Sequence, residues 1–469
     1  MKKKIQNIKN VASTMLLALL MIGLNGCEKL IEVGVPVNQL TSSNVYTDSV
    51  TAQATVNGMY SVMYNTTGGG NVTASTFGTF VINCPARSAD ESYFPDSPDD
   101  FESNSLDPTN INSNSIWVSS YLSVYHANKI IEGMENSDLS ATLKRQLIGE
   151  AKFIRAYCYY TLVNFFGDVP LVTKTDVQTN ISMPRTPSDQ VYALIIQDLK
   201  DAQSSLARDY SWSAGLRTRA NYWSATAMLA RVYLYQKEYA LAETESSKVI
   251  ANSTLFTMPT LSTTFLKAST ETIWAFNTNQ FGYPFITRAF LTGSTGEPGQ
   301  PVTAQLVAAF ERDLTRPEFE DDRFTAWLRR SPGGRYYSVK YQSSTAGANT
   351  EFAVVLRLAE QYLIRAEARI QQDKLTDGIS DLNVVRTRAG LRGTPSTGKA
   401  NLLLAVEHER QVELNMEFGH RWFDLKRTGR ATAVLGPIKG QNWQSTDQLY
   451  PIPTVQITSN TNLTQNPGY

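Results

Sequence analysis

The sequence predicts a mostly helical protein with a minor β component, and three observations support this fold class. Apolar residues from Leu147 to Phe165 recur at steps of three and four, as one face of an α-helix requires. Two later segments each carry two such apolar stripes joined by a short polar turn. By contrast, residues 335–340 and 352–357 have the composition of short strands.

The chain begins with a predicted targeting segment, residues 1–26. Four lysines among the first nine residues precede the apolar run Val11–Leu24, which is typical of a secretory signal and short for a membrane span. Leu24-Asn25-Gly26 is followed at once by Cys27, so the segment resembles a bacterial lipoprotein signal in which that Cys is acylated. We predict lipidation of Cys27, with several acyl chains, because a single chain attaches only marginally. The alternative is an ordinary exported protein with a chance Cys at this position.

Residues 27–50 are polar and contain Pro36, so we expect an extended lead between the lipid and the globule. Residues 51–469 are predicted to form a single domain that opens with a helix over 51–64. Residues 65–108 then read as a long irregular loop, with three consecutive glycines and several prolines. Loops of this length inside a compact domain are uncommon and often functional.

Paired helices are predicted over about 117–390. The helix around 147–165 is apolar on more than one side and should end at Gly167. The later pairs begin at Trp223 and at Ala359, and alanines stand at the expected close contacts. These two-helix units resemble tetratricopeptide repeats, although no strict 34-residue period runs through the chain.

A second insertion and a C-terminal block complete the predicted organisation. Residues 273–288 alternate aromatic with polar residues between the two later helical pairs, which is too aromatic for a bare linker. Residues 391–469 form the C-terminal block.

Composition excludes several classes of function. The chain has 469 residues, and 43 Lys plus Arg balance 43 Asp plus Glu, so no basic surface favours nucleic acid as a partner. Only Cys84 and Cys158 follow Cys27, which excludes a disulfide framework and any CxxC site. Cys158 lies in an apolar helix and is expected to be a core thiol. A disulfide between Cys84 and Cys158 is the alternative.

The densest charged motif runs from Glu407 to Arg427. Glu409, Glu413 and Glu417 are spaced by four, and Arg410 lies three before Glu413, so these charges share adjacent helix faces. Paired carboxylates can act as acid and base. We favour the structural alternative, an ion-pair network that locks the helix and the turn after it.

Signatures of catalysis, metal binding and cofactor binding are missing from the sequence. The three histidines, His126, His408 and His420, do not have the four-residue spacing of a helical zinc pair. No Gly-x-Ser-x-Gly elbow and no phosphate-binding loop is present. The spacing of Asp96, Asp99 and Asp100 does not match an EF-hand, so they are interpreted as solvated loop acids. The sequence does not decide whether a structural calcium ion is bound. We therefore predict no catalytic residue, no metal and no cofactor.

The predicted first loop carries a candidate ligand site made of Arg87, Asp90, Tyr93 and Phe94. An aromatic face beside an Arg and a carboxylate suits a sugar, because its C–H face stacks while its hydroxyls bond to planar polar groups. The same groups would also hold a peptide. In the plainer interpretation these aromatics fold back and close the loop.

Several separated motifs, in order, resemble the SusD/RagB family of outer-membrane nutrient-binding lipoproteins, and the resemblance covers essentially the whole mature chain. The matching segments are residues 150–157, 166–171, 357–368, 382–386, 409–427, 450–453 and 465–469.

The resemblance implies a tetratricopeptide-like scaffold, a ligand face built by inserted loops and no enzymatic activity. It also implies a lipid anchor in the outer membrane, facing the cell surface, and a SusC-like TonB-dependent barrel as partner. The ligand is expected to be an oligosaccharide, or a peptide in RagB-type members. Family ligand residues fall in variable loops, so the second insertion contributes Phe281, Tyr283, Phe285 and Arg288 as candidates by position only.

Two other functions compete with this hypothesis. One is a surface glycoside hydrolase, which the missing nucleophile and metal set argue against. The other is a purely structural repeat adaptor, which ligand-dependent thermal stabilisation would distinguish from a small-molecule binder.

Overall fold

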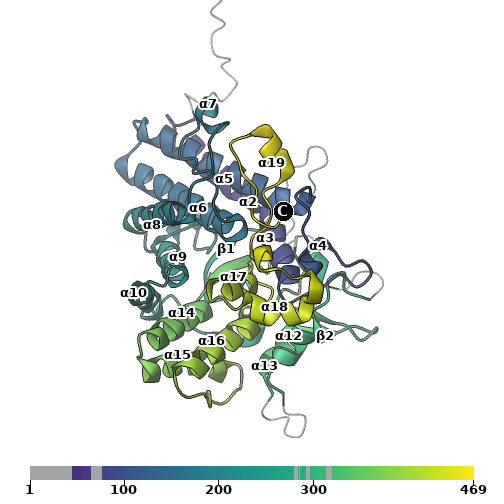
Figure 1. The fold of residues 1–469 in the computed structure, drawn as a ribbon. Helices are drawn as coiled ribbons and strands as arrows, with labels where there is room; N and C mark the ends of the chain where they lie inside the picture. Colours follow the sequence, from purple (N-terminus) through teal and green to yellow (C-terminus); the bar gives the residue numbers. More distant parts are fainter. Residues whose placement is uncertain are drawn as a thin grey trace, which may run out of the picture.

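Eight helices form one continuous layer of the molecule. The structure is a computed structural model that describes residues 45–64, 76–278, 284, 286–291, 296–312, 320–345 and 347–469. The helices of this layer are α5 (Ile111–Glu135), α6 (Ala141–Phe166), α8 (Ser188–Ser205), α9 (Tyr222–Tyr235), α10 (Tyr239–Ile250), α14 (Leu358–Gln371), α15 (Leu375–Arg388) and α16 (Lys399–Glu413). Each packs on the next in this order (Figure 1). The predicted mostly helical fold with a minor sheet is confirmed.

Helix α6 lies at the centre of the hydrophobic core. The hydroxyl of its N-cap, Ser140, accepts a hydrogen bond from the Leu143 N–H, and the helix ends at Gly167, as predicted, where φ is +72°. That backbone conformation favours glycine. The rings of Phe153 and Tyr157 pack against Trp274 at centroid distances of 4.9 and 5.4 Å, so α6 is buried against the inserted strand as well as against its helical neighbours.

Both predicted helical pairs are present and use the same kind of turn. Residues 236–238 join α9 to α10, and residues 372–374 join α14 to α15. Each turn contains one residue with positive φ, Lys237 at 61° and Asp373 at 62°. Because α10 also packs on α14, the two pairs form one stack although more than 100 residues separate them.

In the described part of the chain, two small antiparallel sheets accompany the helices. β1 (Thr272–Phe276) pairs with β4 (Ala353–Arg357), and β2 (Leu328–Arg330) pairs with β3 (Tyr336–Ser338). β3 and β4 confirm the two predicted strands. All residues of β1 and β4 are buried, and β4 runs directly into α14, so this sheet ties the second insertion to the scaffold.

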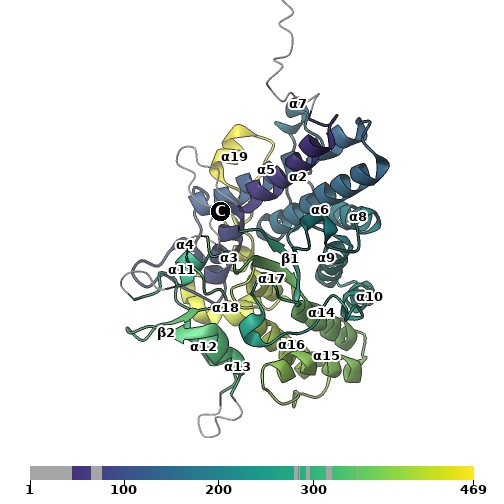
Figure 2. The same cartoon turned by 180° about the vertical axis from the view of Figure 1, so that it is seen from behind.

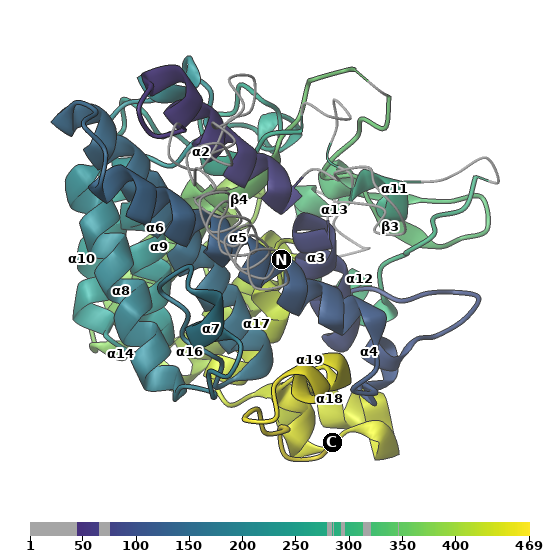
Figure 3. The same ribbon diagram turned by 90° about the horizontal axis from the view of Figure 1, so that it is seen from above.

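The opposite side of the molecule is built from short elements. These are α3 (Thr76–Ser88), α4 (Asp100–Ser103), α11 (Thr287–Phe290), α12 (Ala304–Ala309) and α13 (Asp322–Trp327), together with β2 and β3. Seen from behind and from above, they lie away from α8, α9 and α10 (Figure 2, Figure 3). The other α-helices among the described residues are α2 (Ser49–Tyr64), α7 (Val177–Asn180), α17 (His420–Arg427), α18 (Ala431–Lys439) and α19 (Thr454–Ser459).

The predicted irregular loop over 65–108 is wrong in part, because α3 and α4 lie within it. Phe77, Val81 and Cys84 of α3 are buried in the core, and that burial outweighs the poor helix-forming character of Pro85 inside the helix. Asp99 is not a fully solvated loop acid either. Its carboxylate caps α4 by accepting hydrogen bonds from the N–H groups of Phe101 and Glu102.

The predicted lead over 27–50 is also shorter than expected. Tyr46 is 7% exposed and contacts α5 at Gly133, so the folded body begins by Val45. Cys27 lies outside the described residues. Among the residues that the structure describes, no helix combines the length and the hydropathy needed to cross a bilayer. Cys84 and Cys158 are both buried and unpaired.

The C-terminal residues close the end of α6. The Tyr450 N–H donates to the Phe165 carbonyl at 2.7 Å, and the Asn466 side chain donates to the Phe166 carbonyl at 2.9 Å. These contacts satisfy carbonyl groups that a helix end leaves unpaired.

Candidate ligand-binding face

Arg87 lies in the last turn of α3 and connects the two insertions. Its guanidinium group pairs with Asp99 at 2.9 Å and donates to the side-chain oxygen of Gln300 at 3.4 Å. The same group stacks over the ring of Phe94, 4.2 Å from the ring centroid. Arg87 is only 2% exposed, so its charge is used inside the protein.

Asp90 is likewise buried and engaged. Arg421 donates to both of its carboxylate oxygens, at 2.9 and 3.0 Å, and the Gln411 amide donates at 3.2 Å. Of the four candidates in the first loop, Arg87 and Asp90 are therefore buried beneath the surface and stabilise the loop. The side chains of Tyr93 and Phe94 are partly exposed.

Backbone pairing joins the first loop to the segment that follows the second insertion. Ser92 and Val302 form an antiparallel bridge, and the Tyr93 N–H donates to the Pro301 carbonyl at 3.2 Å. On its other side, the Val302 N–H donates to the Tyr336 carbonyl at 2.9 Å. We call the surface formed by residues 89–99, residues 296–303 and the β2–β3 hairpin the loop face.

Gln300 extends this connection to α11. Its side-chain amide donates to the Ser92 hydroxyl at 2.7 Å, and its backbone N–H donates to the Ala289 carbonyl at 2.9 Å. Arg288 belongs to α11, but its side chain is not described, and Phe281, Tyr283 and Phe285 lie outside the described residues. The structure thus brings the first loop beside the end of the second insertion without placing the aromatic side chains of that insertion.

Buried polar groups hold the loop face in place. The Lys439 ammonium donates to the carbonyls of Arg87 and Glu102 at 3.0 and 2.7 Å, and burial lowers the pKa of this lysine to about 8. The Glu102 carboxylate accepts a hydrogen bond from the Phe94 N–H at 2.5 Å. Burial, reinforced by the charge of Asp90, raises the pKa of Glu91 to about 8. Hydrogen bonds from these side chains therefore hold the backbone of the first loop against the rest of the protein.

Sequence reasoning missed the contribution of the β2–β3 hairpin. Tyr336 and Tyr337 are partly exposed on β3, and Arg330 is exposed on β2. The available signal was the pair of tyrosines within a predicted strand. It pointed to a strand, and only the pairing of Val302 with Tyr336 shows that this strand borders the loop face.

The charged motif over 407–427 is structural, as we favoured. Glu409, Glu413 and Glu417 are buried and accept hydrogen bonds from cationic side chains that come from other segments of the chain. The cations are Arg323, Lys340, Arg357, Arg386 and Arg388. With these partners the carboxylates are committed to ion pairs rather than poised for acid and base chemistry.

One group of possible metal ligands appears beside this network. Glu311, His408 and Glu409 bring ligand atoms within 4.8 Å of one another. Both carboxylates accept hydrogen bonds from Arg386, and the His408 ring nitrogen Nε2 lies 2.7 Å from the Ala309 carbonyl. Both carboxylates and the Nε2 of His408 are thus engaged within the protein, and the absence of a metal site stays a prediction.

Comparison with known proteins defines the class. Residues 37–234 match the family model described as starch-binding associating with outer membrane, and residues 325–469 match the model of the SusD family. The SusD-like protein P38 of Formosa agariphila is 23% identical to this chain, and the match covers 99% of this chain and all of that one.

Solved structures share the fold. A SusD superfamily protein from Bacteroides vulgatus superposes with a TM-score of 0.78 at 19% identity, covering 90% of this chain and all of that one. A laminarin-binding SusD-like protein superposes with a TM-score of 0.74 at 24% identity, with the same coverage. The chain belongs to the SusD/RagB family.

Proposed function

We propose that this chain is a cell-surface lipoprotein that captures an oligosaccharide at the loop face and passes it to a SusC-like TonB-dependent barrel in the outer membrane. The observation that carries the proposal is the bridge between Ser92 and Val302, because it joins the first loop to the segment that follows the second insertion, about 200 residues further along the chain. The described part of that surface presents the rings of Tyr93 and Phe94.

The chemistry of this surface suits a sugar. An exposed aromatic ring offers an apolar platform for the C–H face of a pyranose. Arg87 behind the Phe94 ring fixes the orientation of that platform, since a guanidinium group over a ring face is attractive. The second insertion would supply Tyr283 or Phe285 as a further platform, and Phe281 and Arg288 as neighbours.

The relatives favour a glycan over a peptide. One matched family model is described as starch-binding, and one structural neighbour is described as laminarin-binding. We therefore propose carbohydrate as the ligand class and binding without bond cleavage as the activity. A peptide ligand in the same role is the alternative, and a surface glycoside hydrolase is the weaker one because the buried carboxylates named above are committed to ion pairs.

The predicted lipidation of Cys27 belongs to the proposed location at the outer membrane. The family model that matches residues 37–234 is described as associating with that membrane. Mass spectrometry of the mature protein should show acyl chains on Cys27, and Cys27→Ala should release the protein from membranes. An unmodified thiol at Cys27 would exclude this anchor.

The ligand site is tested by calorimetry with laminari- and malto-oligosaccharides. We expect at least one of Tyr93→Ala, Phe94→Ala, Tyr283→Ala and Phe285→Ala to weaken binding by about 1 to 3 kcal/mol, the loss measured for stacked rings elsewhere. Tyr125→Ala is the matched control, because Tyr125 is 41% exposed on α5, outside the loop face.

Two results would contradict the assignment. If all four loop variants bind like the wild type, the loop face is not the site. If short peptides bind and both glycan series do not, the ligand class is wrong although the site stands.

A further inference from the structure

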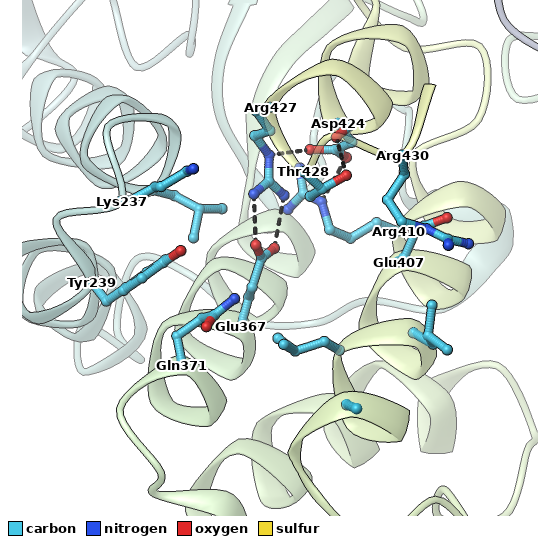
Figure 4. A pocket seen from close by; sticks show the side chains of 14 residues that line it. Lys237, Tyr239, Glu367, Gln371, Glu407, Arg410, Asp424, Arg427, Thr428 and Arg430 are labelled. Atoms are coloured by element: carbon cyan, nitrogen blue, oxygen red, sulfur yellow. Dashed lines mark hydrogen bonds and ion pairs between the residues drawn. The ribbon is translucent and has the colours of Figure 1, made fainter. Parts of the chain in front are cut away.

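A separate pocket of about 260 Å³ lies between the two helical pairs and the turn of α17. Its lining comes from the α9–α10 turn, α14, α16 and α17, including the segment just after α17 (Figure 4). None of the lining residues belongs to the loop face, although Gln411 of α16 and Arg421 of α17 bond to Asp90 beneath it. The pocket is therefore distinct from the site proposed above.

Every carboxylate in this pocket already has a cationic partner. Arg427 binds Glu367 through two hydrogen bonds of 2.6 and 2.7 Å and also donates to Asp424 at 2.7 Å. Glu407 accepts from Arg430 at 3.0 Å. Burial would raise the pKa of Asp424, but its arginine partners outweigh burial and hold that pKa below its ordinary value.

Two cationic side chains of the pocket have donor groups without an acceptor among the described residues. The side chain of Arg410 is 1% exposed; its Nε donates to Asp424 at 2.7 Å, while Nη1 and Nη2 have no hydrogen-bond partner among the described residues. Lys237 is exposed at the mouth and makes no ion pair within the described part of the chain. Four cationic side chains thus face three carboxylates, and the surplus charge is positive. A buried donor without an acceptor is unfavourable, so an anionic oxygen is the complement that this pocket lacks.

The remaining walls combine neutral polar groups with an apolar surface. The Tyr239 hydroxyl and the Gln371 amide have no hydrogen-bond partner in the described structure, and their polar ends point, like that of Lys237, toward the Glu367–Arg427 pair (Figure 4). Leu403 and Leu404 form the apolar wall, and Leu404 is 47% exposed. Convergent polar groups beside an apolar wall are typical of small-molecule sites.

We propose that this pocket binds a single acidic sugar unit of the hexuronate type. Its carboxylate would bond to Arg410 and Lys237, its hydroxyls to Tyr239 and Gln371, and one ring face would rest on Leu403 and Leu404. The volume is below the roughly 300–1,000 Å³ of pockets for drug-sized ligands, which fits one ring rather than a chain. A neutral sugar would leave the cations without an acceptor, and a simple aliphatic acid would leave the hydroxyl partners unused.

The proposal is tested on the purified mature protein by calorimetry and ligand-observed NMR with glucuronate. Glucose, acetate and N-acetyl-dialanine serve as comparison ligands. Lys237→Gln removes an exposed cation that has no structural partner, so the fold should be retained and glucuronate should bind about tenfold more weakly, the effect of one charge-assisted hydrogen bond. Arg410→Lys keeps a cation beside Asp424 and removes the two free Nη groups, and it should weaken binding at least as much. Lys200→Gln, an exposed lysine on α8, should change nothing.

The binding measurements either support or overturn the proposal. Glucuronate binding that exceeds glucose and acetate binding, and that falls in Lys237→Gln with an unchanged melting temperature, supports it. Equal binding of glucose, tighter binding of N-acetyl-dialanine, or no binding of glucuronate at tens of millimolar overturns it. Oligosaccharide binding at the loop face involves none of these residues, so failure here would leave the proposed function intact.

Discussion

Individual buried carboxylates in this protein differ in charge state because their partners differ. Burial alone would raise the pKa of Glu413, but Arg388, Arg357 and Arg323 outweigh it and hold this pKa well below the ordinary value. Glu91 is equally buried but makes no direct ion pair with any described residue, and its pKa rises to about 8. The first residue is a charged member of a network, and the second is neutral below about pH 8.

We predict that Glu413→Gln lowers the free energy of unfolding by about 3 to 5 kcal/mol. The substitution leaves three buried guanidinium groups with one fewer anionic partner, and breaking a buried ion pair from one side is costly. Asp373→Asn is the control, because the Asp373–Lys399 pair is exposed and should contribute under about 1 kcal/mol. Urea unfolding at pH 7 measures both. A loss below about 1 kcal/mol for Glu413→Gln would show that the network adds little to stability.

Glu91 predicts a pH dependence of stability. Its pKa is near 4.5 in the unfolded chain and about 8 in the folded protein, so the folded state holds one more proton between these values. The Glu91 contribution to stability therefore falls as pH rises from about 4.5 to 8. In Glu91→Gln this slope should be missing, so the variant should gain stability relative to the wild type as pH rises. Urea unfolding at pH 5, 6, 7 and 8 tests this, and parallel pH profiles of the two proteins would contradict it.

At the scale of elements, the packing of α14 on α15 depends on one glycine. A Cβ atom added at Gly378 would lie 2.5 Å from Ile370 Cγ1 and 3.0 Å from the Ala366 carbonyl oxygen. A larger residue at this position requires the Ile370 side chain to shift or the two helices to separate. The sequence pattern predicted the pair, but the distance between its helices is set at this contact.

We predict that Gly378→Ala destabilises the protein by about 1 to 3 kcal/mol, the range for overpacking a core. The clash outweighs the roughly 1 kcal/mol by which alanine favours a helix over glycine. Gly58→Ala on α2 is the matched control, since a Cβ there meets nothing within 4 Å and should stabilise by up to about 1 kcal/mol. Thermal melts of the two variants should shift in opposite directions. If both shift upward, the α14–α15 contact is more adaptable than the structure indicates.

At the scale of the whole molecule, the proposed role needs a partner that moves the ligand. If the predicted lead between Cys27 and Val45 is extended, its residues 28–44 reach at most about 60 Å. A lid of this kind would open by swinging on that lead and close by trapping ligand against the barrel.

We therefore predict that the protein co-purifies with an outer-membrane TonB-dependent barrel. A C-terminal tag and mild detergent should recover both proteins in one complex. Variants of the lead that keep its length should retain uptake, whereas strong shortening should reduce it. Recovery of this protein alone, under conditions that preserve known barrel complexes, would favour a free-standing surface binder.

Local patterns in the sequence determined the helical scaffold. The apolar repeat over 147–165, the two helical pairs, the strands near 336 and 353 and the stop at Gly167 are all present. Each depends on a spacing of a few residues, which can be read directly from the sequence. The structural interpretation of Glu409, Glu413 and Glu417 was correct, but the predicted single helix was not, because α16 ends at Glu413 and leaves Glu417 beyond it. Their cationic partners come from other segments, which helical spacing could not show.

The partners of the candidate site residues were decided only by the tertiary structure. Arg87 and Asp90 appeared to be ligand groups because they stand beside aromatics, but Gln300 and Arg421 engage them from 213 and 331 residues away. Helix α3 was hidden by Pro85 and by a weak local preference, which burial of its apolar face overrides. The sequence by itself determined the class, the scaffold and the predicted anchor, since these rest on local periodicity and contiguous motifs. Which side chains face solvent on the loop face depends on pairings across the whole chain, and these form only when the fold brings distant segments together.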